Sequence, residues 1–216
     1  MSTLTFDKPK TASNTPERKA FRQLVYPALR AMGALPHGQL VDAEGTSQDK
    51  RAGIDWIISQ ADGTQHTVAC RIQWQTDWGT FSIRYRTGSG QYSELTKRIR
   101  SIINGGTYPS LTLQAMIYST AGARKGAPSD WTILNAYVVR TEELYRHVIT
   151  LLDGDDDHFR LCGCCTKEKL APDGARFVGV AITEEGRQLT GTKDSLLANG
   201  VDVRMLRHRT EALGLW

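Results

Sequence analysis

Hydrophobic positions recur first with the spacing of a helix and later with the alternation of strands. Thr15-Pro16-Glu17 has the features of a helix start: a hydroxyl N-cap, a proline in the first turn and an acid near the positive end. Apolar residues then follow at helical spacing as far as Met32, and Gly33 ends the pattern. Pro27 is expected to kink or divide this helix, because proline lacks the backbone N–H.

Strand-like runs come next, after a polar and turn-rich stretch at 34–52. They cover residues 53–60, 67–75 and 81–86, and an Asp-Gly turn joins the first two. Because the links are short, these runs predict an antiparallel meander of three strands.

The second half alternates helices and strands. The patterns predict helices over 91–104 and 141–152 and apolar strands over 111–118 and 131–139. A strand over 176–183 and helical pieces within 194–213 are weaker features. The element order predicts an α/β fold with a mixed central sheet flanked by helices.

These patterns divide the chain into three parts. Residues 1–14 are expected to be a flexible tail, residues 15–152 the core, and residues 153–216 a small C-terminal extension whose role the sequence leaves open.

Composition narrows the class of protein only modestly. The chain has 216 residues, 40% hydrophobic and 23% charged, with a formal net charge of +4. That balance permits nucleic-acid binding without requiring it. No apolar run is long enough to span a bilayer, and the polar N-terminus lacks a secretory signal, so a cytoplasmic protein without membrane association is expected.

The informative chemistry lies in the predicted hairpin. Its first strand carries an acid, Asp55, within an apolar run, and its second carries Ala69, Arg71 and Gln73 at alternating positions. Side chains alternate along a strand, so these three share one face, which Asp55 can meet from the paired strand. An acid beside a cation could hold a divalent metal and steady the charge on a phosphate. A simpler alternative is an acid satisfied by a backbone N–H or by Arg71.

This arrangement resembles the PD-(D/E)xK nuclease superfamily, over roughly residues 15–152. The family core has a helix, a hairpin carrying the acid and the (D/E)xK motif, then a helix and another strand. The resemblance implies a restriction-endonuclease-like fold, Mg²⁺ or Mn²⁺ as cofactor, and DNA hydrolysis in a phage, mobile-element or defence context. It also implies a homodimer or a subunit of a larger complex. Asp55 matches the first acid and Arg71 the lysine, and Glu17 falls where some members carry an extra acid.

Two departures from the motif leave two hypotheses open. Ala69 occupies the position of the second carboxylate, and Arg71 cannot serve as a base. In the first hypothesis Glu94, from the next helix, supplies the displaced carboxylate, so Asp55, Arg71, Gln73 and Glu94 are the catalytic candidates. Asp49 is a further possible metal ligand, or else a surface acid. In the second hypothesis the fold is kept without catalysis, as a subunit that binds nucleic acid or protein.

Basic and aromatic residues near the hairpin offer contacts to nucleic acid. Arg84 and Arg86 alternate on the third strand, and Lys97 lies on the following helix, where these side chains could neutralise phosphates. A solvated helix face and a charged edge strand are the alternative. Trp74 and Trp78 could stack on bases or could pack within the sheet.

The cysteines do not favour a zinc site. Four possible ligands lie close together, at His158, Cys162, Cys164 and Cys165. Structural zinc is usually held by ligand pairs from two separate loops, and no second Cys-x-x-Cys pair exists. A cysteine-rich turn held reduced in the cytosol is the expectation.

Overall fold

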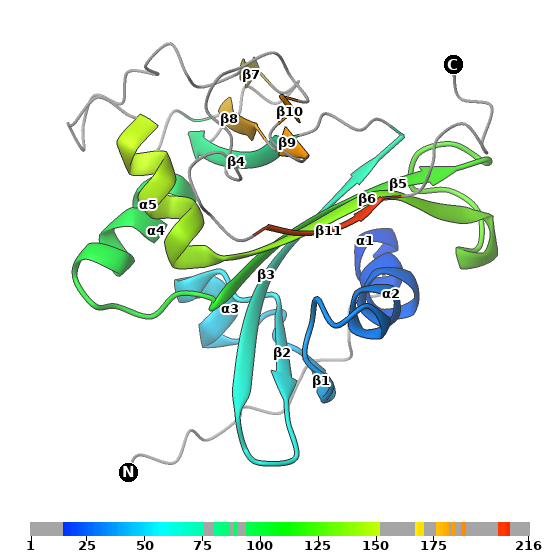
Figure 1. Cartoon of the computed structure of the whole chain (residues 1–216), viewed down its shortest axis with the longest axis horizontal. Coiled ribbons are helices and arrows are strands. Elements are labelled where there is room, and N and C mark those ends of the chain that lie inside the picture. Colours follow the sequence, from blue (N-terminus) through cyan, green and yellow to red (C-terminus); the bar gives the residue numbers. More distant parts are fainter. Residues whose placement is uncertain are drawn as a thin grey trace. The chain divides into compact units, whose positions relative to one another are not determined.

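The computed structural model describes residues 15–75, 80–86, 89, 94–151, 167–170, 176–181, 183–184, 187–188 and 203–207. Within these residues the fold is a mixed α/β arrangement, drawn in Figure 1. The predicted tail at 1–14 and most of the predicted extension lie outside the described residues.

The N-terminal helix begins where the sequence predicts and is continuous through Pro27. The Thr15 hydroxyl accepts a hydrogen bond from the Arg18 N–H at 3.4 Å, which caps α1 (Pro16–Ala20). A π-helical segment, η1 (Phe21–Val25), leads into α2 (Tyr26–Ala31), whose first turn contains the proline. A wider turn before the proline accommodates a ring that would otherwise clash with the preceding turn. Gly33, at φ +73°, follows the helix.

The main sheet has six strands in the order β1-β2-β3-β5-β6-β11. The strands are β1 (Gln39–Asp42), β2 (Trp56–Ser59), β3 (Gln65–Trp74), β5 (Leu111–Ser119), β6 (Trp131–Arg140) and β11 (Val203–Arg207). β2 is antiparallel to both β1 and β3, whereas β3 and β5 are parallel. The predicted mixed sheet with flanking helices is therefore confirmed.

The predicted three-stranded meander is wrong in its third strand. β4 (Thr80–Arg86) does not pair with β3 but with β8 (Arg176–Ala181), which in turn pairs with β7 (Lys167–Leu170). The physical reason is that β5 occupies the edge of β3 that a meander would have used. The strand expected over 176–183 is confirmed as β8 together with the start of β9 (Thr183–Glu184), which pairs with β10 (Arg187–Gln188).

Two regions contain structure that the sequence patterns did not predict. The stretch at 34–52 holds β1 and a short helix, α3 (Ser47–Ala52), capped by the Thr46 hydroxyl. Both elements are too short for a recognisable periodicity. β11 lies within 194–213, where helical pieces were expected, so that expectation is wrong for residues 203–207.

Each face of the main sheet packs against its own helix. Alternate residues of β2, β3 and β5, including Trp56, Val68 and Leu113, form one buried cluster with α1, η1 and α2. On the other face, Ile57 packs with Ala52 of α3. Strands covered on both faces carry apolar residues at consecutive positions, which explains the long apolar runs in the sequence.

The chain divides into two compact units that interleave in sequence. The first comprises Met1–Asp77, Pro109–Val138 and Met205–Trp216, and contains most of the main sheet. The second comprises Trp78–Tyr108 and Val139–Arg204, with α4 (Glu94–Ile103) and α5 (Thr141–Leu151). Leu95 and Ile99 of α4 and Leu144 of α5 are buried. Among the described residues, no helix has the length and apolar character to cross a membrane.

A close contact beside β1 leads to a stability prediction. A Cβ atom at Gly38 would lie 2.5 Å from the Ser59 carbonyl oxygen and 2.9 Å from Ile58 Cγ2. We expect Gly38→Ala to lower the free energy of unfolding by about 2 kcal/mol, as overpacking typically does, measured by urea denaturation. Gly106→Ala is the matched control, because its methyl group would meet nothing closer than 3.4 Å. Equal stability of the two variants would contradict the prediction.

Candidate functional site

Asp55 lies where the chain leaves α3 and enters β2. Gly53, at φ +62°, ends α3 in a left-handed conformation that suits glycine, and two residues later the chain joins the sheet. The Asp55 N–H donates to the Val68 carbonyl at 2.9 Å, and the Asp55 carbonyl accepts from the Ala43 N–H at 3.0 Å. The backbone of Asp55 is thus held from both sides.

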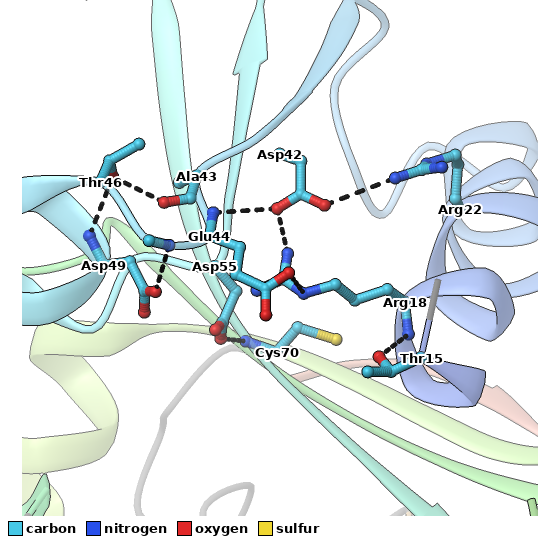
Figure 2. A network of polar contacts seen from close by, with 11 residues as sticks. Thr15, Arg18, Arg22, Asp42, Ala43, Glu44, Thr46, Asp49, Asp55 and Cys70 are labelled. Carbon is cyan, nitrogen blue, oxygen red and sulfur yellow. Dashed lines mark hydrogen bonds and ion pairs between the residues drawn. The ribbon is translucent and has the colours of Figure 1, made fainter. Parts of the chain in front are cut away.

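The carboxylate of Asp55 bonds to the backbone of the neighbouring strand. Its Oδ2 atom accepts from the Cys70 N–H at 2.7 Å, as Figure 2 shows. The β2–β3 register ends at the pair Trp56 and Val68, and the Asp55 N–H bonds to the carbonyl of the same Val68. Asp55 is thus joined to β3 by its backbone at Val68 and by its side chain at Cys70, the residue before Arg71. A hydrogen bond to a charged acceptor also fixes the direction of the side chain.

Arg71 and Gln73 share the sheet face that points away from α1 and α2. The alternate residues Cys70, Ile72 and Trp74 pack in the cluster with those helices, so the intervening side chains face the other way. The parallel register sets Gln114 of β5 beside Arg71, and Gln114 is only 1% exposed. The sequence pattern predicts an apolar strand over 111–118. A single glutamine within that strand does not indicate that it will lie beside Arg71.

A network of charged residues connects the first helix to the segment next to Asp55. Arg18 donates through Nη1 to Asp42 Oδ1 and through Nε to Glu44 Oε2 at 3.0 Å. Arg22 lies 3.4 Å from the second oxygen of Asp42. Sequence reasoning missed this cluster, because its members come from a helix and from a stretch that reads as a polar loop.

Asp49 and Glu17, two acids considered as extra ligands, both make structural contacts. The Asp49 carboxylate accepts from the Gly45 N–H at 2.8 Å, and the Asp49 N–H donates to the Thr46 hydroxyl. This resembles a reciprocal cap at the start of α3. Glu17 accepts from the Trp74 indole N–H at 3.2 Å and pairs with Arg124 at 2.6 Å.

Glu94 belongs to the second unit, whereas Asp55, Arg71 and Gln73 belong to the first. Within its own unit Glu94 accepts a hydrogen bond from the Tyr145 hydroxyl at 3.2 Å. The guanidinium of Arg98 lies 5.8 Å from the centre of the Tyr145 ring. The assignment of Glu94 as a displaced catalytic carboxylate stays a prediction.

The predicted nucleic-acid contacts differ in exposure. Arg84 on β4 and Lys97 on α4 are both exposed, whereas the next residue of the helix, Arg98, for which no nucleic-acid contact is predicted, is buried. The side chain of Arg86 lies outside the described residues. Trp74 packs edge-on against Trp131, with ring centroids 5.1 Å apart, so it serves the core, as the packing alternative expected. Trp78 lies outside the described residues.

Candidate metal ligands and the Cys70 thiol are further reactive groups in the described part of the chain. No group of three or more His, Cys, Asp and Glu residues in it could hold a metal ion. His158 and the three cysteines after it lie outside the described residues. Burial raises the pKa of the Cys70 thiol well above its usual value, and the negative charge of Asp55 adds to this effect, while Arg18 and Arg71 oppose it. The residue as a whole is only partly buried, and the raised pKa of its thiol disfavours the thiolate, which is the nucleophilic form.

Comparison with known proteins found no matching family model, no similar curated protein and no similar solved structure. The site must therefore be judged on its own geometry.

The cap on α3 leads to a test of Asp49. We expect Asp49→Ala to lower the free energy of unfolding by about 1 kcal/mol in EDTA, because the Gly45 N–H loses its acceptor. Urea denaturation measures the change. Lys50→Ala, an exposed substitution on the same helix, should leave stability nearly unchanged. A loss that appears only when Mn²⁺ is present would contradict the capping role and support a ligand role.

Proposed function

We propose that this chain is a metal-dependent nuclease of PD-(D/E)xK type that hydrolyses DNA phosphodiesters. The observation that carries the proposal is the hairpin β2–β3, which sets Asp55 against the strand bearing Arg71 and Gln73. A helix precedes this hairpin, and α4 and then β5 follow it. That order agrees with the core of the family, and it supports a restriction-endonuclease-like fold.

Each of the three residues has a chemical role in this proposal. The Asp55 carboxylate is the metal ligand. Arg71 carries a guanidinium cation, which stabilises the negative charge that builds on the phosphate. Gln73 carries both a donor and an acceptor, which suits it to orient the attacking water. The likeness to defence and mobile-element nucleases is an analogy at the level of the fold.

The single carboxylate of Asp55 meets the minimum that a Mg²⁺ site requires of the protein. Magnesium binds through one or two carboxylates, with waters and substrate phosphates completing its octahedron, so a dedicated cage of acids is not required. Asp55 supplies one carboxylate, Ala69 supplies none, and Asp49 or Glu94 remains the candidate for a second. A bound Mg²⁺ would neutralise phosphate charge and lower the pKa of its water.

A second candidate function has its own supporting observation. Ala69 occupies the motif position at which the family carries its second carboxylate, and an Asp55 oxygen is engaged by the Cys70 N–H. Both facts suit a protein of the same fold that binds nucleic acid, or a protein partner in a larger assembly, without cutting. In that case Asp55 has a structural role in joining β2 to β3.

A cleavage assay tests the first function. The purified chain is incubated with plasmid, single-stranded DNA and RNA in Mg²⁺, in Mn²⁺ and in EDTA. We expect metal-dependent cleavage of DNA that Asp55→Asn reduces at least about 100-fold, because the substitution removes charge while keeping size. Asp62→Asn is the matched control, since Asp62 lies at the turn of the same hairpin and bonds only locally, to the Thr64 N–H. If the folded protein cuts nothing in any condition, the nuclease proposal fails and the binding function is favoured.

A binding assay tests the predicted basic contacts. We expect Arg84→Gln and Lys97→Gln each to weaken DNA binding and to reduce the slope of log affinity against log salt by about 1, as the loss of one phosphate contact does. Fluorescence anisotropy over a salt series measures both quantities. Arg146→Gln is the control, because Arg146 is exposed but pairs with Glu142 at 2.8 Å. An equal effect of all three substitutions would indicate net charge rather than defined contacts.

A further inference from the structure

The cluster around Arg18 and Asp42 is nearly buried, which is unusual for charged side chains. The side chain of Arg18 is 13% exposed and that of Asp42 is 10% exposed. Desolvating two charges costs free energy that their attraction only partly offsets, so such a pair is weak evidence for stability. Its orienting effect on neighbouring groups is the more informative property.

One set of contacts connects the cluster to the backbone of Asp55. Asp42 ends β1, and its carboxylate also accepts from the Glu44 N–H at 2.9 Å. The side chain thereby holds the turn that contains Ala43. The Ala43 N–H donates to the Asp55 carbonyl at 3.0 Å, as noted above. The Arg18–Asp42 ion pair is therefore linked to Asp55 through the turn at Ala43 and the backbone hydrogen bond from Ala43 to Asp55. Figure 2 draws these residues.

A second set of contacts connects the cluster to Trp56, the residue that follows Asp55. The guanidinium groups of Arg18 and Arg22 lie 5.2 and 5.4 Å from the centre of the Trp56 ring. Phe21 stacks on the same indole, with ring centroids 4.8 Å apart. Trp56 is almost fully buried, so its orientation is set by these contacts.

We infer that Arg18 and Asp42 are positioning residues for Asp55: together they set the direction in which its carboxylate leaves β2. Arg18 acts on Asp55 from both sides, through Asp42 and Ala43 before it and through Trp56 after it. Neither Arg18 nor Asp42 need touch substrate or metal. The consequence for catalysis rests on the proposed nuclease function, whereas the placement of the carboxylate does not.

The Cys70 amide reports this placement directly, because its N–H donates to Asp55 Oδ2 at 2.7 Å. The full-length chain is labelled with ¹⁵N-cysteine, and Cys70→Ser identifies the resonance among the four cysteines. A short bond to a carboxylate moves the amide proton downfield and slows its exchange. Asp55→Asn gives the position of the resonance when that charge is lost.

We expect Arg18→Gln and Asp42→Asn to move the Cys70 amide toward its position in Asp55→Asn. Its exchange should become about tenfold faster, the factor that matches losing one hydrogen bond to a charged group. Arg18→Lys should show a smaller change, because lysine keeps the charge but not the planar fork. Glu44→Gln is the matched control: Glu44 pairs with the same arginine, but its side chain is 41% exposed, and the substitution keeps the Glu44 N–H that bonds to Asp42.

The inference is overturned if Arg18→Gln and Asp42→Asn fold and leave the Cys70 resonance where the unmodified protein has it. It is also overturned if every substitution of the pair unfolds the protein, since the pair would then hold the fold rather than place one side chain. A merely stabilising role would lower the unfolding midpoint without shifting this resonance in the folded protein.

Cleavage kinetics separate this inference from the proposed function. If the protein cuts DNA, Arg18→Lys and Asp42→Asn should lower kcat with little change in KM, because a misdirected carboxylate weakens the transition state and not substrate binding. If the unmodified protein cuts nothing, the nuclease proposal fails, and the amide resonance alone still decides whether the pair positions Asp55.

Discussion

The arrangement of the first unit depends on the pairing of β3 along both of its edges. β3 is antiparallel to β2 on one side and parallel to β5 on the other, so every alternate side chain is committed to one of two faces. Val68, Cys70, Ile72 and Trp74 face the first helices. Arg71 is thereby directed to the opposite face. A slip of one residue would exchange the two sets and bury the arginine against the helices.

The charged cluster at Arg18 adds specificity to this apolar framework. Burial of aromatic and aliphatic side chains supplies most of the driving force for packing α1 on the sheet. Apolar contacts alone tolerate small shifts, whereas an arginine with two carboxylate partners and an indole beneath it fits one arrangement. The residues that Arg18 of α1 contacts lie in the segment that bonds to the backbone of Asp55. This location is what connects a feature of packing to the candidate site.

The chemistry of the candidate site depends on which residue occupies position 69 of β3. A carboxylate at position 69 would complete a familiar metal-binding pair, and alanine offers only a methyl group. The polar side chains on the Arg71 face of β3 and β5 include Arg71, Gln73 and Gln114, which are a cation and two neutral amides. A cation next to an acid that bonds to the same strand would suit the recognition of phosphate whether or not cleavage follows. Nuclease and binding protein therefore share most of the geometry and differ in how a metal is held.

Local features were readable from the sequence because their causes are local. Thr15 and Pro16 mark the start of the first helix, and the Asp62-Gly63 turn closes the β2–β3 hairpin, with the Gly63 N–H bonded to the Gln60 carbonyl at 3.1 Å. The alternation around Arg71 was enough to place Ala69, Arg71 and Gln73 on one face. These patterns depend on side-chain spacing and on backbone conformations that only a few residues favour.

What the tertiary structure alone decided involves partners distant in sequence. β4 pairs with β8 and not with β3, because β5 occupies the edge of β3 that β2 leaves open. No local sequence pattern indicates which strand takes that edge. The same holds for Gln114 beside Arg71 and for Arg18 beside Asp42. The sequence by itself determined which residues could carry chemistry. Only the fold decided which of them meet, because strand order and register bring together positions that the chain keeps apart.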